Sequence, residues 1–318
     1  MKPNSTESIF EVNHNGHFVI IGCVYTGLAI FAFPFYLPMI YVLRSTKELH
    51  ENISYKLINL LNICDLLQSC NHILTGVFIV FPVLAHKVDP FVRIMGYTAN
   101  TLWLSSFVII AVLAATRLAV TFSNLKVNKW AVWQKITLAL GGIYIFTIWM
   151  IGCVTLNFEL VGVSWSYDPT VMFTGTLAEM ELYFCFPIMV FSFGSYVLIL
   201  GNIINKKRQT QSSSSFRTEI AILTQAFFLT SYMALIMTLW HNAESWFEMT
   251  DITLACLNTS WILFAHLNVI LLICTNRGVR RQFSLIMGLT PPRKITQVTS
   301  TLGASSIAMK KVSFSPKN

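Results

Sequence analysis

The ionisable side chain that stands out in this chain is Asp65, the one formal charge within the otherwise uncharged run 57–86. A carboxylate among apolar residues is costly in free energy and by default marks a functional site. Asn62 lies three residues earlier, and Asn268 lies in a later apolar run. Their amides could help to hydrate or coordinate the carboxylate, so we predict a sodium or water site at Asp65, linked to a conformational change. The alternative is an aspartate that only fixes helix packing.

Other side chains do not form a catalytic pattern. The chain has no His-Glu-x-x-His metal motif, and no second carboxylate shares an apolar run with Asp65. Gly194-Ser195 is too short a pattern to indicate a nucleophile, and small residues there favour helix packing. We therefore predict that the protein is not an enzyme, has no cofactor and has no metal centre apart from the site at Asp65.

Seven apolar runs must position these residues, and each exceeds the roughly 20 residues that a membrane-spanning helix needs. Each run is free of formal charge apart from Asp65. The runs are 12–43, 57–86, 94–116, 136–158, 182–205, 220–243 and 252–276. The predicted fold class is an all-α membrane protein, a seven-transmembrane helix bundle.

Composition agrees with a chain embedded in lipid. The 318 residues are 54% hydrophobic and only 11% charged, with a mean hydropathy of +0.62, so a soluble domain would lack an ordinary charged surface. The net charge of +8 does not indicate nucleic acid as a partner, because the basic residues lie in short segments between apolar runs. The predicted partner is the lipid bilayer.

The basic residues predict the orientation. Of the 22 Lys and Arg residues, all but Lys2, Lys87 and Arg93 fall on one side if the spans alternate. The positive-inside rule makes that side cytoplasmic, with an extracellular N-terminus and a cytoplasmic C-terminus. Asn4-Ser5-Thr6 is then a glycosylation sequon on the outer tail.

One domain is expected, with short loops. Residues 1–17 form an extracellular tail, 18–287 the seven-helix domain, and 288–318 a disordered cytoplasmic tail rich in Ser, Thr and Lys. Helices are expected near 18–43, 55–83, 93–121, 135–156, 179–205, 218–241 and 251–274. The basic and apolar segment 277–287 predicts a short amphipathic helix on the inner leaflet. The largest outer loop, 157–178, is either a cover for the mouth of the bundle or a plain connector.

Two charged residues could act at the cytoplasmic ends of the helices. Arg117 ends the third run and Glu219 precedes the sixth, so an ion pair between them could break when the helices separate. A lone arginine at an inner helix end is also what the positive-inside rule predicts.

Aromatic and polar residues gather toward the outer halves of the helices, where a small molecule could bind between helices. Interfacial Trp and Tyr are also common lipid anchors. The candidate ligand-binding residues are Trp103, Trp165, Tyr183, Trp240, His241, Asn258 and Trp261.

Other seven-helix or multi-span classes fit less well. A retinal protein needs a lysine in the last span, and 252–276 contains none. A transporter would show internal repeats and several buried ionisable groups. An oligomeric channel remains open, because several copies could form a pore.

Several motifs resemble the nematode serpentine chemoreceptors, most closely class T. Residues 54–58, 63–66 and 71–78 are similar to that family's second helix, and Leu113-Ala114-Ala115-Thr116-Arg117 matches the end of its third. Ser164-Trp165-Ser166-Tyr167-Asp168-Pro169 resembles its outer loop. Gln225, Trp261 and 275–281 resemble its last two helices. The similarity covers nearly all of 18–285 in the right order.

The resemblance implies a G-protein-coupled receptor for a small molecule, in the plasma membrane of sensory neurons and their cilia, with a heterotrimeric G protein as partner. Arg117 would contact the G protein. The chain departs from rhodopsin-like receptors at Thr116-Arg117-Leu118 and at 268–272, and it has no cysteine pair for an outer-loop disulfide. The alternative is a ligand-gated channel subunit, or an uncoupled escort or scaffold protein.

Overall fold

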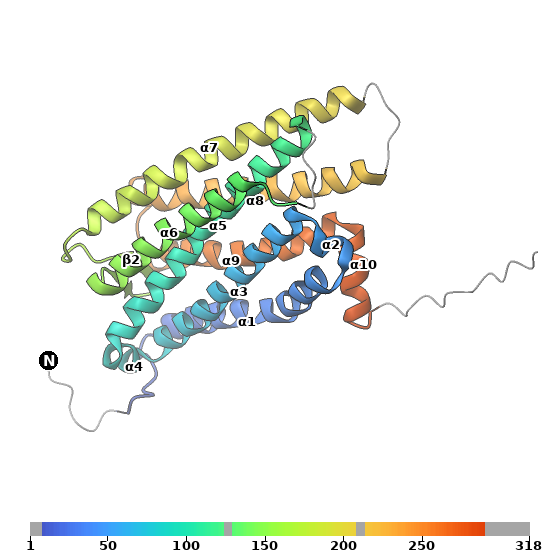
Figure 1. Cartoon of the computed structure of the whole chain (residues 1–318). Coiled ribbons are helices and arrows are strands. Elements are labelled where there is room, and N and C mark those ends of the chain that lie inside the picture. The colour runs from blue at the N-terminus through green and yellow to red at the C-terminus, as the bar shows by residue number, and fades with distance from the viewer. Residues whose placement is uncertain (1–7, 124–128, 208–213, 290–318) are drawn as a thin grey trace, which may run out of the picture.

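Seven long helices form the body of the molecule (Figure 1). The computed structural model describes residues 8–123, 129–207 and 214–289. Each long helix is apolar and long enough to cross a membrane. They are α1 (Gly16–Ser45), α3 (Ile53–Val80), α5 (Asp89–Ser123), α6 (Val132–Thr155), α7 (Thr174–Lys207), α8 (Ser214–Trp246) and α9 (Asp251–Thr275). The predicted seven-helix bundle is confirmed.

Short elements lie at the two ends of the bundle. One end, here called the hairpin end, carries the strands β1 (Phe158–Val161) and β2 (Ser164–Tyr167) and the helix α4 (Pro82–Lys87). The other, here called the α10 end, carries α2 (Lys47–Glu51) and α10 (Arg277–Ile286). Figure 1 shows the two groups at opposite ends of the long axis.

The helices pack unequally. α3 and α5 lie at the centre: α3 contacts α1, α5 and α9, while α5 contacts α3, α6 and α7. α6 is peripheral, because it buries only Gln134, Ile148 and Gly152. Gly22 of α1 and Gly76 of α3 allow their two backbones to approach, since a Cβ added to Gly22 would lie 2.7 Å from the carbonyl oxygen of Gly76. Small residues permit such close approach in membrane bundles.

The second span ends earlier than expected. A helix was predicted to run to residue 83, but α3 ends at Val80 and a separate short helix begins at Pro82. Proline has no N–H to donate to the preceding turn and its ring clashes there, whereas the first position of a helix tolerates both. Pro34 and Pro38, by contrast, lie inside α1.

The loop between α6 and α7 contains an antiparallel hairpin that was not predicted. Phe158 pairs with Tyr167 and Val161 with Ser164, so only two residues form the turn. Gly162 there has a φ of +59°, which glycine adopts without strain. The hydroxyl of Tyr25 donates to the carbonyl oxygen of Val163 at 3.0 Å and ties the turn to α1.

α10 begins directly after α9 and lies close to the range expected for an amphipathic helix. Asn276 caps its start by accepting from the N–H groups of Gly278 and Val279. Val279 and Phe283, four residues apart on one face, are buried, and the ring of Phe283 stacks on Phe35 of α1. The polar residues of α10 occupy the remaining faces.

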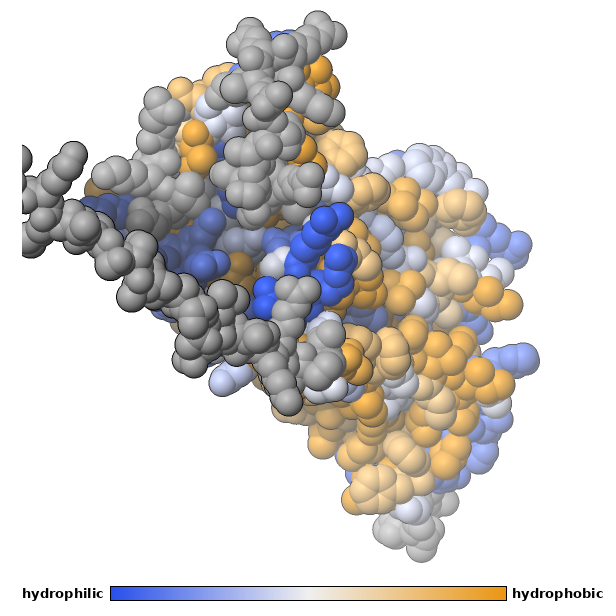
Figure 2. Space-filling model, turned by 90° about the vertical axis from the view of Figure 1, so that its right-hand side faces the viewer, coloured by the Kyte–Doolittle hydropathy of each residue, from blue (hydrophilic) through white to orange (hydrophobic). Residues whose placement is uncertain are grey.

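The sides of the bundle are apolar. Along α6 and α7, large hydrophobic residues such as Ile143, Phe146, Phe186 and Val197 are more than half exposed. Figure 2 views the α10 end: hydrophilic residues gather near the middle of that face, and apolar residues cover the flank below and to the right. A surface of this kind suits lipid as its surroundings. The chain is a multi-pass membrane protein.

Candidate functional site

Arg93 of α5 fastens the hairpin to the bundle. Its guanidinium donates to Asp89 (2.9 Å), Asp168 (2.9 Å) and Glu159 (3.3 Å), and to the carbonyl oxygen of Leu156 at 2.9 Å. Three acids around one arginine leave this cluster net negative. The cluster joins the end of α6 and both flanks of the hairpin to α5.

Trp165 of β2 packs its side chain between the hairpin and the helices α3 and α5. It is 2% exposed, stacks on Phe158 with ring centroids 5.7 Å apart, and donates from Nε1 to the hydroxyl of Thr75 at 3.2 Å. Gly96 of α5 is required at this contact, since a Cβ there would clash with the indole ring. Trp165 packs against the bundle and is not among the lining residues of the pocket described below, so its predicted ligand contact stays a prediction.

The hairpin should withstand moderate acid. The Thr170 hydroxyl and the Arg93 guanidinium stabilise the charged form of Asp168 and lower its pKa from 3.8 to about 2. A lowered folded-state pKa gives stability that is present above the unfolded value and is lost as the pH falls through the folded one. We expect hydrogen exchange of β1 and β2, corrected for intrinsic rates, to stay constant from pH 7 to about 4 and to rise below that.

Asp168→Asn is the matched variant for this measurement. In this variant, the rise in hydrogen exchange between about pH 4 and 2 should be smaller by the part that titration of Asp168 contributes. A rise in hairpin exchange already between pH 7 and 5 would contradict the assignment.

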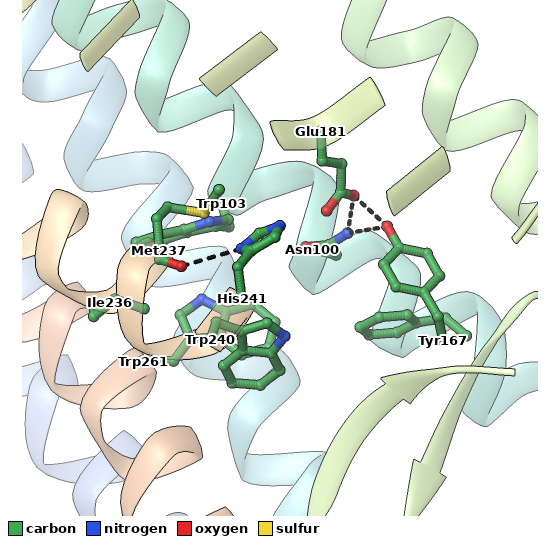
Figure 3. Close-up of a pocket in the computed structure, with 10 residues that line it drawn as sticks. Asn100, Trp103, Tyr167, Glu181, Ile236, Met237, Trp240, His241 and Trp261 are labelled. Atoms are coloured by element: carbon green, nitrogen blue, oxygen red, sulfur yellow. Dashed lines mark hydrogen bonds between the residues drawn. The ribbon is translucent and has the colours of Figure 1, made fainter. Parts of the chain in front are cut away.

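A pocket lies beside the hairpin, between α5, α7, α8 and α9 (Figure 3). Its volume is about 40 Å³, enough for about three water molecules at roughly 10–15 Å³ each. Its wall combines aromatic rings with a few polar groups, as small-molecule sites do. The lining residues are Asn100, Trp103, Phe158, Tyr167, Glu181, Ile236, Met237, Trp240, His241 and Trp261.

One wall of this pocket is polar. Glu181 of α7 is 8% exposed, and its Oε1 accepts hydrogen bonds from the amide of Asn100 and the hydroxyl of Tyr167. Asn100 also donates to the Tyr167 hydroxyl oxygen at 3.1 Å. These three side chains come from α7, α5 and β2, so the pocket's polar wall joins the hairpin to two helices.

The opposite wall is aromatic. The rings of Trp240 and Trp261 meet at 5.9 Å and 76°, and those of Trp103 and Trp261 at 6.4 Å and 71°. His241 lies above Trp240 and Trp261 and beside Trp103 in Figure 3, and its Nδ1 lies 3.1 Å from the carbonyl oxygen of Met237. Four of the predicted ligand residues, Trp103, Trp240, His241 and Trp261, therefore come together.

The remaining predicted ligand residues lie elsewhere. Tyr183 is 74% exposed and lines a surface groove between α7 and α8. Asn258 is fully buried in α9 and is not among the lining residues of the pocket. With Trp165, these are the three candidates that the structure does not bring to the pocket.

A buried polar network occupies the middle of the bundle. Asn268 of α9 donates from Nδ2 to Asn62 Oδ1 at 2.8 Å and to Asp65 Oδ2 at 3.2 Å. Gln225 of α8 donates to Asn268 Oδ1 at 2.8 Å. Asp65, Asn62 and Asn268 are 0% exposed. The structure thus joins the residues predicted around Asp65 and adds α8 to them.

The pocket and the network are linked by one residue. Trp261 lines the pocket and donates from Nε1 to Gln68 Oε1 at 3.1 Å. Gln68 lies one turn from Asp65 on α3, and Trp261 lies two turns, roughly 10 Å, from Asn268 on α9. Trp261 therefore contacts both the pocket and α3 beside the network.

Arg117 lies toward the α10 end of α5 and is 2% exposed. The preceding Thr116 accepts from Gln134 Nε2 at 2.8 Å, which ties this turn to α6. The side chain of Glu219 lies outside the described residues, so its ion pair with Arg117 stays a prediction. Asn4 lies outside them as well.

Sequence reasoning missed the polar wall of the pocket. Glu181 was given no role in the sequence analysis, because it lies just before the apolar run 182–205 and near the expected helix start at 179. α7 begins at Thr174 instead, so Glu181 lies two turns inside the helix. Asn100 and Tyr167 were not proposed as site residues, because their shared partner Glu181 was not recognised. Within the described ranges, no three His, Cys, Asp or Glu residues group as metal ligands.

These observations define a multi-pass membrane protein whose seven helices enclose a pocket near one end and a polar network in the middle. The family model described as serpentine type 7TM GPCR chemoreceptor Srt matches residues 4–296. The chain therefore belongs to the Srt family of serpentine seven-transmembrane chemoreceptors, which confirms the resemblance to class T. This is a family of receptors rather than of enzymes. No curated protein matched the chain.

Proposed function

We propose that the protein is a chemosensory receptor that binds a small molecule in the pocket at the hairpin end and activates a heterotrimeric G protein at the α10 end. The observation that carries this proposal is the position of Trp261. It contacts the pocket and, through Gln68, the helix that holds Asp65. Gln225 connects the same network to α8, which also supplies Met237, Trp240 and His241 to the pocket.

The size of the pocket supports a ligand-driven change of conformation. At about 40 Å³ it is too small for most organic ligands, so binding must move side chains of its wall. A ligand shifts a conformational equilibrium only by binding one state more tightly than the other. A state with a wider pocket, displaced Trp261 and displaced α8 meets this requirement.

The proposed orientation places the hairpin end outside the cell and the α10 end in the cytoplasm of a plasma-membrane protein. Basic residues at the α10 end, among them Arg277, Arg280 and Arg281, support it through the positive-inside rule. Arg117 is buried in the described conformation, so a G protein could contact it only after neighbouring helices separate. Uncovering Arg117 is therefore the proposed output of ligand binding.

Asp65 is proposed to bind water or a sodium ion. Its Oδ1, the Nδ2 of Asn62 and the Nε2 of Gln68 are buried and make no hydrogen bond of normal geometry within the described residues, although Tyr36 lies next to the carboxyl group. Buried polar atoms are nearly always hydrogen-bonded to protein or ordered water. Water could accept from the two amide nitrogens and donate to Asp65 Oδ1, the atom that a sodium ion would contact, at a site that joins α1, α3 and α9.

The test is ligand-evoked second-messenger signalling in cells that express the chain with an N-terminal tag. A small-molecule library is screened against untransfected cells, and antibody staining of intact cells reports the orientation. Once an agonist is identified, it is tested on Gln68→Met, which removes the acceptor of Trp261 Nε1 without changing a lining residue of the pocket. This variant should bind the ligand largely as before and signal about 5- to 150-fold more weakly.

Two results would contradict the proposal. An N-terminal tag that stains only permeabilised cells would reverse the orientation. A chain that reaches the surface but stays silent through the library would favour the channel or escort reading, for which ion-current recording is the next measurement.

A further inference from the structure

We propose that the pocket recognises an organic ammonium cation, with the Glu181 carboxylate as its counter-ion and the tryptophans of the opposite wall as its cation–π surface. This inference rests on the proposed function, because it names the chemical class of ligand for the same pocket. It depends on four features of the described residues: the buried carboxylate, the aromatic wall, the histidine at the pocket and the surrounding acids.

The carboxylate of Glu181 is only partly neutralised. Its hydrogen bonds from Asn100 and Tyr167 both reach Oε1, and both donors are uncharged. No described Lys, Arg or His lies within ion-pair distance of it. Figure 3 shows its second oxygen on the side of the carboxylate that faces His241 in this view. A buried carboxylate without a cation is costly, and a cationic ligand would offset that cost.

The aromatic wall supplies the second element of cation recognition. The faces and edges of Trp103, Trp240 and Trp261 border the same cavity as Glu181. A cation placed over an indole face is attracted by the ring quadrupole, and the attraction grows when water is excluded. A small alkylammonium would meet Glu181 with its N–H groups and the indoles with its carbon atoms.

His241 offers a further acceptor. A carbonyl oxygen can only accept a hydrogen bond, so the contact of 3.1 Å with Met237 O requires the proton on Nδ1. The neutral ring then has its lone pair on Nε2. An ammonium donates hydrogen bonds and accepts none, which suits this group and Glu181 together. An anionic ligand would meet no Lys or Arg in the pocket wall and would be repelled by Glu181.

The charges outside the pocket favour the same class of ligand. The Arg93 cluster holds Asp89, Glu159 and Asp168 around one arginine, so it carries a net negative charge. Glu248 and Asp251 are exposed where α8 meets α9. A surface of one sign raises the local concentration and the association rate of an oppositely charged ligand. This field attracts cations to the end of the molecule that holds the pocket.

The test measures binding without signalling. The full chain is purified in lipid nanodiscs, and its melting temperature is recorded with methyl- to hexylammonium, benzylammonium and tetramethylammonium chlorides. Each primary ammonium is paired with the alcohol of equal carbon skeleton. We expect at least one ammonium to raise the melting temperature in a saturable way. The alcohol of the same carbon skeleton should bind at least about tenfold more weakly.

Glu181→Gln keeps the shape of the side chain and an oxygen that accepts from Asn100 and Tyr167, so its unliganded melting temperature should stay close to that of the unaltered chain. Its affinity for the ammonium should fall about 10- to 100-fold. Trp240→Leu should weaken binding about 2- to 30-fold. Glu179→Gln, which removes an exposed carboxylate two residues away, is the matched control and should bind as before.

The outcomes separate this inference from the proposed function. No binding by any ammonium in the panel, equal binding of alcohols, or unchanged affinity in Glu181→Gln would overturn the cation site. Agonism by an uncharged library compound without ammonium binding would overturn it while upholding the receptor. Ammonium binding that needs Glu181 but never produces a second messenger would uphold the site and count against G-protein coupling.

Discussion

Replacing Arg117 by alanine is expected to abolish ligand-evoked signalling while the chain still reaches the cell surface and still binds its ligand. The guanidinium is buried near the α10 end in the described conformation, far from the pocket along α5. Its loss therefore removes the group that separation of the helices would present to the G protein. Second-messenger response, surface staining and ligand binding are measured on the same cells.

Two variants accompany this measurement. Lys135→Ala removes an exposed positive charge at the start of α6, near the same end, and should signal normally. Arg117→Lys keeps the charge but loses the planar fork of donors, so an intermediate response is expected. Normal signalling by Arg117→Ala at equal expression would exclude this residue from coupling.

Replacing Asp65 by alanine is expected to lower the stability of the bundle and to weaken signalling. The change leaves Asn268 Nδ2 with one acceptor, Asn62 Oδ1, instead of two. It also removes the Asp65 carboxylate from the centre of the buried network. Loss of a buried hydrogen-bonding partner costs about 1–3 kcal/mol. The melting temperature of the purified chain and the agonist response report the two effects.

Asp65→Asn distinguishes an ion from water. If sodium binds, the unaltered chain should melt at a higher temperature in NaCl than in KCl. The amide of Asp65→Asn can still bond to water but lacks the charge that holds sodium, so this difference should vanish in the variant. No difference between the two salts in the unaltered chain would favour water. Leu67→Ala changes a lipid-facing residue of the same helix and should alter neither property. Lower stability with unchanged signalling would reduce Asp65 to a packing residue, and equal stability would contradict its place in the hydrogen-bond network.

Much of the fold could be predicted because charge marks the limits of an apolar span. The last span was expected at 251–274 and is found at Asp251–Thr275, where Asp251 and Arg277 bound the uncharged run. The hairpin was not predicted, because each strand has only four residues and depends on Arg93 and Tyr25 to hold it against the helices. Such tertiary contacts leave no periodic signal in the sequence.

The candidate site was predicted unevenly for the same reason. Asp65 and Asn268 stand out because polar residues are rare in apolar runs, and the structure joins them. Glu181 lies at the edge of a run, where acids are common, and only the longer α7 places it in the pocket. A polar residue inside a span is recognised because its neighbours are apolar. A polar residue near the end of a span can be placed only when the position at which the helix begins is known.

The close approach of α1 and α3 at Gly22 and Gly76 decides which parts of the bundle can serve as a fixed reference. Backbones in direct contact cannot slide without collision, and α10 is fastened to this pair through the stacked rings of Phe35 and Phe283. We expect α1, α3 and α10 to move together as one frame. In the proposed orientation, a partner that touches both α10 and α8 would sense the displacement of α8 relative to that frame. Its response would then be insensitive to tilting of the whole receptor in the bilayer.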